Sequence, residues 1–307
     1  MKAETAKRYK GVLIMIVSVL ALSLMDGIGK VQSGVYPEFQ ILFLRTLPIV
    51  LLALLAIFLE RKKIQNILHV NPHCLYLQSL RGIAWAASGC FFYFAFAKGN
   101  LTYVYILSFL HPIFGQIFSY FWLRRPAKKY TYIPLTIMFA GVIVGAQGSS
   151  EIKDYSVLLL AVIAAFFFSL EFILAEEIQE KHPEINDKAT LFYSSIIGLF
   201  IFIAIAFIAA PLFKANEYWV TPTSFDFGLI FLQGFFGGLG NLGIIIALRY
   251  AESRIIAPWD YMILFFGVII DFVWFGHQPN LHSIVSGLVI ISGGLWLLGN
   301  DIKNTTT

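Results

Sequence analysis

The chain has 307 residues, of which 58% are hydrophobic and only 13% are charged. A water-soluble protein averages about 25% charged residues, and its apolar residues form short amphipathic segments. Here the apolar residues form runs of about 20, the length that crosses a hydrocarbon core about 30 Å thick. The composition excludes a soluble globular protein and indicates a helical membrane protein with several spans.

The formal net charge of +4 does not indicate a nucleic-acid partner, because the basic residues are scattered among short loops. The two cysteines, Cys74 and Cys90, fit neither a disulfide framework nor a metal-binding spacing. The first apolar run continues through Asp26 to Val31 and has a counterpart later in the chain. We therefore interpret it as a membrane span and not as a cleaved signal peptide.

Apolar runs separated by Pro, Gly and charged residues predict an all-α membrane protein with ten transmembrane helices. The connections between the runs are short, and no stretch is left over for a soluble domain. In chain order the predicted spans are about 10–32, 39–59, 75–98, 101–122, 130–148, 155–178, 188–210, 225–249, 255–275 and 283–300.

Lys and Arg residues gather on the side of the membrane that holds both predicted chain ends, and such a bias marks the cytoplasmic side. Sixteen of them fall in the predicted inner segments and four in the outer ones, while Arg45 and Arg81 lie within spans. The sequence predicts a multi-pass protein of the bacterial inner membrane, surrounded by membrane lipids, with both termini cytoplasmic.

The second half of the chain repeats the first when it is shifted by 152 residues. Five spans per repeat is an odd number, so the two halves are predicted to be inverted in the membrane. Inverted repeats that meet at a midplane site are typical of secondary transporters. We expect a first repeat over residues 10–148 and a second over residues 155–300. The matching pairs are Leu80 with Leu232, Gly82 with Gly234, Phe114 with Phe266, Trp122 with Trp274 and Gly141 with Gly293.

With these two repeats, the chain resembles the drug/metabolite transporters of the EamA type. Four short motifs resemble the S-adenosylmethionine uptake transporters of obligate intracellular bacteria within that superfamily. The resemblance implies that a small-molecule substrate crosses the membrane by alternating access. The motifs are LRG at 80–82, LFYS at 191–194, TPTSF at 221–225, and AP at 257–258 followed by Tyr261.

Ionisable side chains inside a membrane span are rare and are candidates for function. Asp26 and Arg45 are predicted at a similar depth, near the outer ends of the first two spans. Lys30 lies one helical turn beyond Asp26, where it can extend to the interface. Asp26 and Arg45 form either a structural ion pair or a charged lining of the outer part of a substrate pathway, and both interpretations can hold.

The sixth predicted span places Glu171 near the inner membrane surface, where inversion would put a counterpart of Asp26. The sequence offers Glu171 no basic partner within the spans, and the nearest inner cations are Arg249 and Arg254. We interpret Glu171 as the second of two related acidic positions on the substrate pathway. The alternative is a helix end that frays into the lipid headgroups.

The stretch IAPWDYM opens the ninth predicted span. Pro258 lacks a backbone donor and starts or bends the helix, which leaves Trp259, Asp260 and Tyr261 in its first turns. Asp260 is either a partner of the helix dipole or part of a cation site together with the aromatic rings. The transporters that the chain resembles typically carry a basic residue there, so an acidic contact would favour a more cationic ligand.

His111, followed by Pro112, falls near the middle of the fourth predicted span. It can relay protons, bind the substrate, or satisfy the carbonyls that the proline frees. Asp271 lies late in the ninth span, near the outer surface, and is expected to be solvated.

Two further residues complete the predicted substrate pathway. Arg81, like Arg45, has a guanidinium that could hold a substrate carboxylate, and Tyr105 lies in the fourth span. The aromatic stretch at 90–96 is expected to be mostly packed or lipid-facing, with one or two rings in the cavity.

Small residues let membrane helices approach closely. Packing within a monomer is favoured over a dimer seam, because ten spans already supply both halves of a transport path. The predicted packing positions are Gly141, Gly145, Gly234, Gly237 and Gly238.

No phosphate-binding loop, H-E-x-x-H motif, nucleophile elbow or metal cluster stands in the sequence, which predicts no catalytic residue, no metal and no cofactor. The sequence favours a secondary transporter of a small cationic or zwitterionic metabolite. The resemblance makes uptake or exchange of S-adenosylmethionine the best single candidate. The alternatives are an amino-acid or drug exporter of the same superfamily and, in another class, a lipid scramblase or lipid-modifying enzyme.

Overall fold

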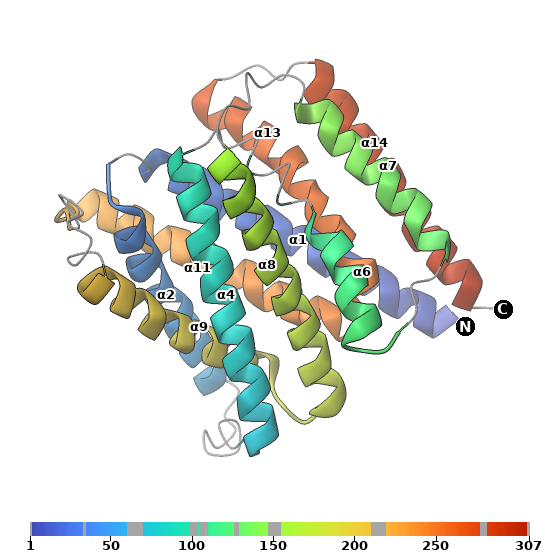
Figure 1. Ribbon diagram of the computed structural model, residues 1–307, viewed down its shortest axis with the longest axis horizontal. Helices are drawn as coiled ribbons and strands as arrows, with labels where there is room; N and C mark the ends of the chain where they lie inside the picture. Colours follow the sequence, from blue (N-terminus) through green and yellow to red (C-terminus); the bar gives the residue numbers. More distant parts are fainter. Residues whose placement is uncertain are drawn as a thin grey trace.

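The computed structural model shows a bundle of long helices (Figure 1). Its two halves each supply a series of helices in the same order. The residues that the structure describes are 2–32, 35–59, 70–98, 104, 108, 110–125, 129–146, 155–209, 219–276 and 281–305.

The helices of the first half are α1 (Lys2–Gln32), α2 (Glu38–Leu59), α4 (Pro72–Lys98), α6 (His111–Phe121) and α7 (Lys129–Ala146). Those of the second half are α8 (Tyr155–Lys181), α9 (Asp187–Ala204) with the π-helical turn η1 (Ile205–Ala209), α11 (Ser224–Leu248), α12 (Ser253–Ile256), the 3₁₀ turn η2 (Ala257–Tyr261), α13 (Met262–Phe275) and α14 (Leu281–Thr305).

Six segments of the described chain are long and apolar enough to cross a membrane. The prediction of an all-α protein with several membrane-length helices is confirmed, because an apolar run of about 20 residues satisfies its own backbone only as a helix. The segments are Ala6–Gln32, Glu38–Leu59, Tyr155–Lys181, Asp187–Ile208, Ser224–Leu248 and Ala257–Phe275.

Of the fourth predicted span, the structure describes helix α6 from His111 onward, with the helical residues Val104 and Ser108 before it, and Tyr105 lies outside the described residues. One predicted span differs in detail from the structure. The ninth is not one continuous helix: α12 gives way to the 3₁₀ turn η2 before α13 begins. Pro258 sits in that turn, and its missing donor explains the interruption.

The two halves are interleaved, so neither forms a separate body. Helix α1 packs on α11 of the other half, and α8 packs in the corresponding way on α4. Likewise α2 packs on α11 and α9 on α4, while α13 lies on α1 and α6 on α8. Helices α7 and α14 pack chiefly on each other and lie side by side at one edge of the bundle (Figure 1). The main helix contacts made by one half thus have counterparts in the other.

Glycines lie where these helices approach most closely. A Cβ at Gly237 would lie 2.8 Å from the Met25 sulfur of α1, and one at Gly238 would lie 3.5 Å from the backbone of Ile49 in α2. Gly141 of α7 lies against Val289 and Ile290 of α14, and Gly145 belongs to the same helix. These contacts are within the chain.

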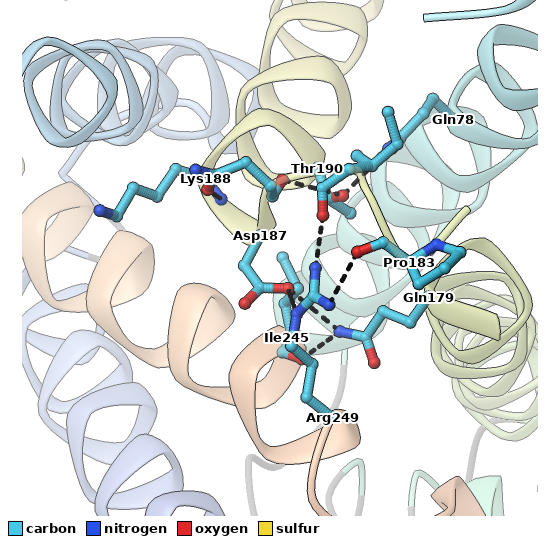
Figure 2. A network of polar contacts seen from close by, with 10 residues as sticks. Gln78, Gln179, Pro183, Asp187, Lys188, Thr190, Ile245 and Arg249 are labelled. Carbon is cyan, nitrogen blue, oxygen red and sulfur yellow. Dashed lines mark hydrogen bonds and ion pairs between the residues drawn. The ribbon is translucent and has the colours of Figure 1, made fainter. Parts of the chain in front are cut away.

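A polar network ties α11 to the start of α9 (Figure 2). Arg249 Nε donates to the Asp187 carboxylate at 2.5 Å, and the same guanidinium reaches the backbone carbonyls of Pro183 and Ile185. Gln179 of α8 donates to the carbonyl of Ile245 at 2.5 Å. The Arg249 guanidinium is therefore bound to groups at this end of the bundle and is not a partner of Glu171.

Candidate functional site

A cavity of about 120 Å³ lies inside the bundle, between helices of the two halves. Both acidic positions that the sequence predicted for opposite ends of the pathway, Asp26 and Glu171, border this one cavity. Helices α1 and α8 thus both pass the same central space, and the placement of the two carboxylates toward opposite ends of the pathway stays a prediction. The polar residues of the lining are Asp26, Arg45, Ser88, Tyr93, Ser108, His111, Glu171, Asn241 and Asp260.

Arg45 is held against one wall of the cavity by an aromatic side chain. Its Nη1 donates to the Tyr93 hydroxyl at 3.0 Å, and its guanidinium carbon lies 4.6 Å from the centre of the same ring. The hydroxyl also accepts from Gln233 Nε2 at 3.2 Å. A guanidinium fixed in this way beside a cavity can receive a carboxylate. The predicted coupling of Asp26 with Arg45 stays a prediction.

Glu171 forms a buried ion pair that the sequence did not predict. Its Oε1 lies 2.6 Å from Nη2 of Arg81, and the two residues are 3% and 1% exposed. Arg81 also donates to the Ser194 hydroxyl and to the carbonyl of Thr190 in α9. Glu171 therefore has a basic partner, and the alternative of a frayed helix end is wrong, since α8 continues to Lys181.

The sequence contained one signal for the pair of Arg81 and Glu171, which is their similar depth in the predicted spans. Arg81 stands six residues from the inner end of its predicted span, and Glu171 seven from the inner end of its own. The repeat pattern gave no such hint, because the counterpart of Arg81 under the 152-residue shift is Gln233, which is uncharged. With its guanidinium engaged by protein groups, Arg81 is less suited than Arg45 to hold a substrate carboxylate.

His111 and Asp260 form a second buried pair at the cavity. His111 Nε2 lies 3.1 Å from Oδ2 of Asp260, and the residues are 1% and 5% exposed. The imidazole lies edge-on to Phe168, with ring centres 5.0 Å apart. The contact joins the start of α6 to the 3₁₀ turn η2.

The two aromatic neighbours of Asp260 pack outside the cavity lining. The Trp259 ring lies 3.3 Å from the position of a Cβ on Gly294 of α14, and Tyr261 packs with Leu135 and Met138 of α7. The two rings therefore do not belong to the lining of this cavity, and the predicted cation site of Asp260 with these rings stays a prediction.

The aromatic faces at the cavity come from other helices. Phe92 and Tyr93 line it, which confirms that a few rings of the 90–96 stretch face the cavity. The side chains of Asp271 and Arg254 lie outside the described residues. Lys30 lies 4.5 Å from the centre of the Phe275 ring. The rings of the lining are Trp85, Phe92, Tyr93, Phe168 and Phe202.

A cluster of charged side chains lies near the end of α8. Arg125 lies 2.5 Å from Glu176 and also contacts Glu180 and Glu252. Burial opposes the charge of Arg125, but these three carboxylates outweigh it and raise the pKa of the guanidinium. Glu176 also accepts from the backbone N of Ser253 at 3.0 Å, so the cluster anchors the start of α12.

A charged cavity enclosed by membrane-length helices is typical of a protein that moves a polar solute across a membrane. The sequence matches the EamA-like transporter family over residues 9–145 and again over residues 155–299. The chain belongs to this family and carries two EamA domains, so it is a membrane transporter and not an enzyme.

Several curated proteins are similar to the chain. A protein of Rickettsia prowazekii (strain Madrid E) named S-adenosylmethionine uptake transporter is 22% identical over 310 residues, 99% of this chain and 98% of that protein. The protein of the same name from Rickettsia conorii is 26% identical over 66% of this chain, a match that spans 65% of that protein. The pseudopaline exporter CntI of Pseudomonas aeruginosa (strain PAO1) is 24% identical over 92% of this chain and 93% of its own length.

A crystal structure has the same fold, with a TM-score of 0.76 over 93% of this chain and 95% of the other. The two sequences are 14% identical, so the likeness concerns the fold alone.

Proposed function

We propose that the protein is a secondary transporter that moves a small cationic or zwitterionic metabolite by alternating access. One observation carries the proposal: a buried cavity between the halves is lined by three carboxylates, one guanidinium and five aromatic rings. Carboxylates and aromatic faces suit a positive group, and the guanidinium suits a carboxylate. Because the two repeats interleave around the cavity, rocking one set of helices against the other would expose it to each side in turn.

S-adenosylmethionine is the best single candidate for the substrate. It carries a sulfonium and an ammonium, which Asp26 and Asp260 can attract, and a carboxylate, which Arg45 can bind. Four of the relatives bear the name of its uptake transporter, and two of them match almost the whole chain. The similarity to a pseudopaline exporter supports export of another metabolite as the second candidate.

Proteoliposomes loaded with unlabelled S-adenosylmethionine are expected to take up the labelled compound from outside by exchange. The physical reason is that a transporter without an ATP-binding motif reopens its cavity to the starting side with a ligand bound. Arg45→Gln should reduce exchange of S-adenosylmethionine strongly, but that of its decarboxylated analogue only weakly. The measurement is the initial rate of labelled uptake for both compounds.

Arg124→Gln provides the matched control, because Arg124 is exposed and lies away from the cavity. It should exchange both compounds like the unsubstituted protein. Absence of exchange with S-adenosylmethionine, together with clear exchange of another amine or amino acid, would favour the second candidate and leave the fold unchanged.

We also propose ten spans arranged as two inverted repeats, about residues 10–148 and 155–300, with both termini cytoplasmic. The excess of Lys and Arg in the predicted inner segments supports this orientation. A single cysteine at position 128, introduced after replacing Cys74 and Cys90, should resist a membrane-impermeant maleimide in intact cells and react after lysis. Labelling of position 128 from outside would contradict both the orientation and the inverted repeat.

A further inference from the structure

The buried pair of His111 and Asp260 has polar atoms that the protein leaves unsatisfied. Nε2 of the imidazole contacts Oδ2 of the carboxylate at 3.1 Å. Among the described residues, His111 Nδ1 and Asp260 Oδ1 have no hydrogen-bond partner, although both are buried. A buried polar atom without a partner is costly, so these two atoms call for a ligand, a proton or water within the cavity.

The geometry fixes which imidazole nitrogen can change its protonation. Beside a carboxylate, Nε2 carries its proton and donates it to Oδ2, so Nδ1 is the atom that binds or releases a second proton.

The pair can change its charge by one unit at the cavity. With the ring neutral the pair has a net charge of −1, and with the ring protonated its net charge is zero. Glu171, by contrast, is paired with Arg81 at 2.6 Å. The titratable and charged groups that face the cavity from the other elements are Asp26, Arg45, Tyr93 and Glu171, with Arg81 behind Glu171, and Tyr261 faces His111 from η2 itself.

We propose that His111 and Asp260 form the coupling site of the transporter, where a proton and the positive group of the substrate bind in alternation. This inference rests on the proposed function and adds the coupling ion to it. When the ammonium or sulfonium of the substrate approaches Asp260, it replaces the charge of the imidazolium. The proton then leaves Nδ1 for water on the open side of the cavity.

One proton is released for each cation bound, and no covalent bond between heavy atoms changes. The two ligands exclude each other because both compensate the same carboxylate. A transporter whose cavity changes sides with either the proton or the cation bound is an antiporter. The gradients of the proton and of the cation set the direction of net transport. Binding of the cation weakens as the pH falls, since protons then occupy the site.

The first experiment compares exchange with accumulation in proteoliposomes, using labelled S-adenosylmethionine and a membrane potential clamped at zero. This compound has a net charge of +1, so its exchange for one proton is electroneutral. With the interior one pH unit more acidic than the exterior, the label should accumulate about tenfold at equilibrium, because one pH unit is a tenfold ratio of proton activity. The opposite gradient should give no accumulation.

Variants assign this effect to the pair. His111→Gln and Asp260→Asn should each abolish the accumulation driven by pH, while counterflow of label against unlabelled compound at equal pH stays measurable in His111→Gln. His282→Gln, at an exposed histidine of α14, should behave like the unsubstituted protein. Absence of counterflow in the unsubstituted protein would refute the proposed function. Counterflow without accumulation driven by pH, or accumulation that persists in His111→Gln, would overturn the coupling site alone.

A second measurement needs no transport. The chain has six histidines, and His111→Gln assigns the resonances of His111 in protein labelled with ¹⁵N-histidine. The measurement follows the protonation of His111 Nδ1 against pH, with and without saturating cation. The cation should shift this protonation to lower pH, because both ligands compensate the same carboxylate. A cation that leaves the protonation of His111 unchanged would overturn the inference.

Discussion

Gly234→Leu is expected to prevent the bundle from assembling, whereas Gly228→Leu on the same helix should leave the yield of folded protein unchanged. A side chain at Gly234 would meet the backbone carbonyl of Arg45 and the ring of Pro48, and neither can rotate away. The close approach of α11 to α2 would then be lost. Among the residues that the structure describes, no atom of another element lies within 4 Å of the Cβ position at Gly228.

Gly82→Leu provides an intermediate case. A Cβ at Gly82 would lie 2.8 Å from the side chain of Ile197, which can move, and not against backbone. The order of yields should therefore be Gly228→Leu, Gly82→Leu and Gly234→Leu, from highest to lowest. The measurement is the monodisperse fraction of a fluorescent fusion protein after detergent extraction. Equal yields at Gly234 and Gly228 would contradict the packing of α11 on α2.

Arg81→Met is expected to cost about 3–5 kcal/mol of stability, because it leaves the Glu171 carboxylate buried without a cation. Glu171→Met should be similarly harmful, since it leaves the guanidinium of Arg81 uncompensated at 1% exposure. The double variant should recover most of the loss, because a buried ion pair and an apolar pair of similar volume are often close in stability. Thermal unfolding of the purified variants provides the measurement.

Arg249→Met is the matched control for this cycle. Arg249 pairs with Asp187, but its side chain is 30% exposed, so solvent can stabilise the charge that is left behind. Its loss should be clearly smaller than that of Arg81→Met. Additive losses at Arg81 and Glu171 would show that the two side chains do not interact directly.

The class of protein followed from the sequence alone because the bilayer imposes a local rule. A segment that crosses about 30 Å of hydrocarbon needs about 20 apolar residues, and its backbone must bond within itself. Each such run is visible in the sequence without knowledge of the others. The repeat pattern and the resemblance to EamA transporters followed in the same way, and the family is now shown by matches over both halves.

The candidate site could be predicted as a set of residues, but its pairs could not. Asp26, Arg45, His111, Glu171 and Asp260 stood out because charge is costly inside a membrane, and all five line one cavity. The sequence provided no partner for Glu171 and did not pair Asp260 with His111.

The tertiary structure decided these contacts, because they depend on side-chain direction and on the packing of distant helices. The partners Arg81 and Glu171 are 90 residues apart in the chain, and His111 and Asp260 are 149 apart. A short 3₁₀ turn directs Asp260 toward His111 and directs Trp259 toward Gly294 of α14. Hydrophobic runs determine that helices form, whereas the crossing of α4 with α8 and the contact of α6 with the turn η2 determine which charges meet.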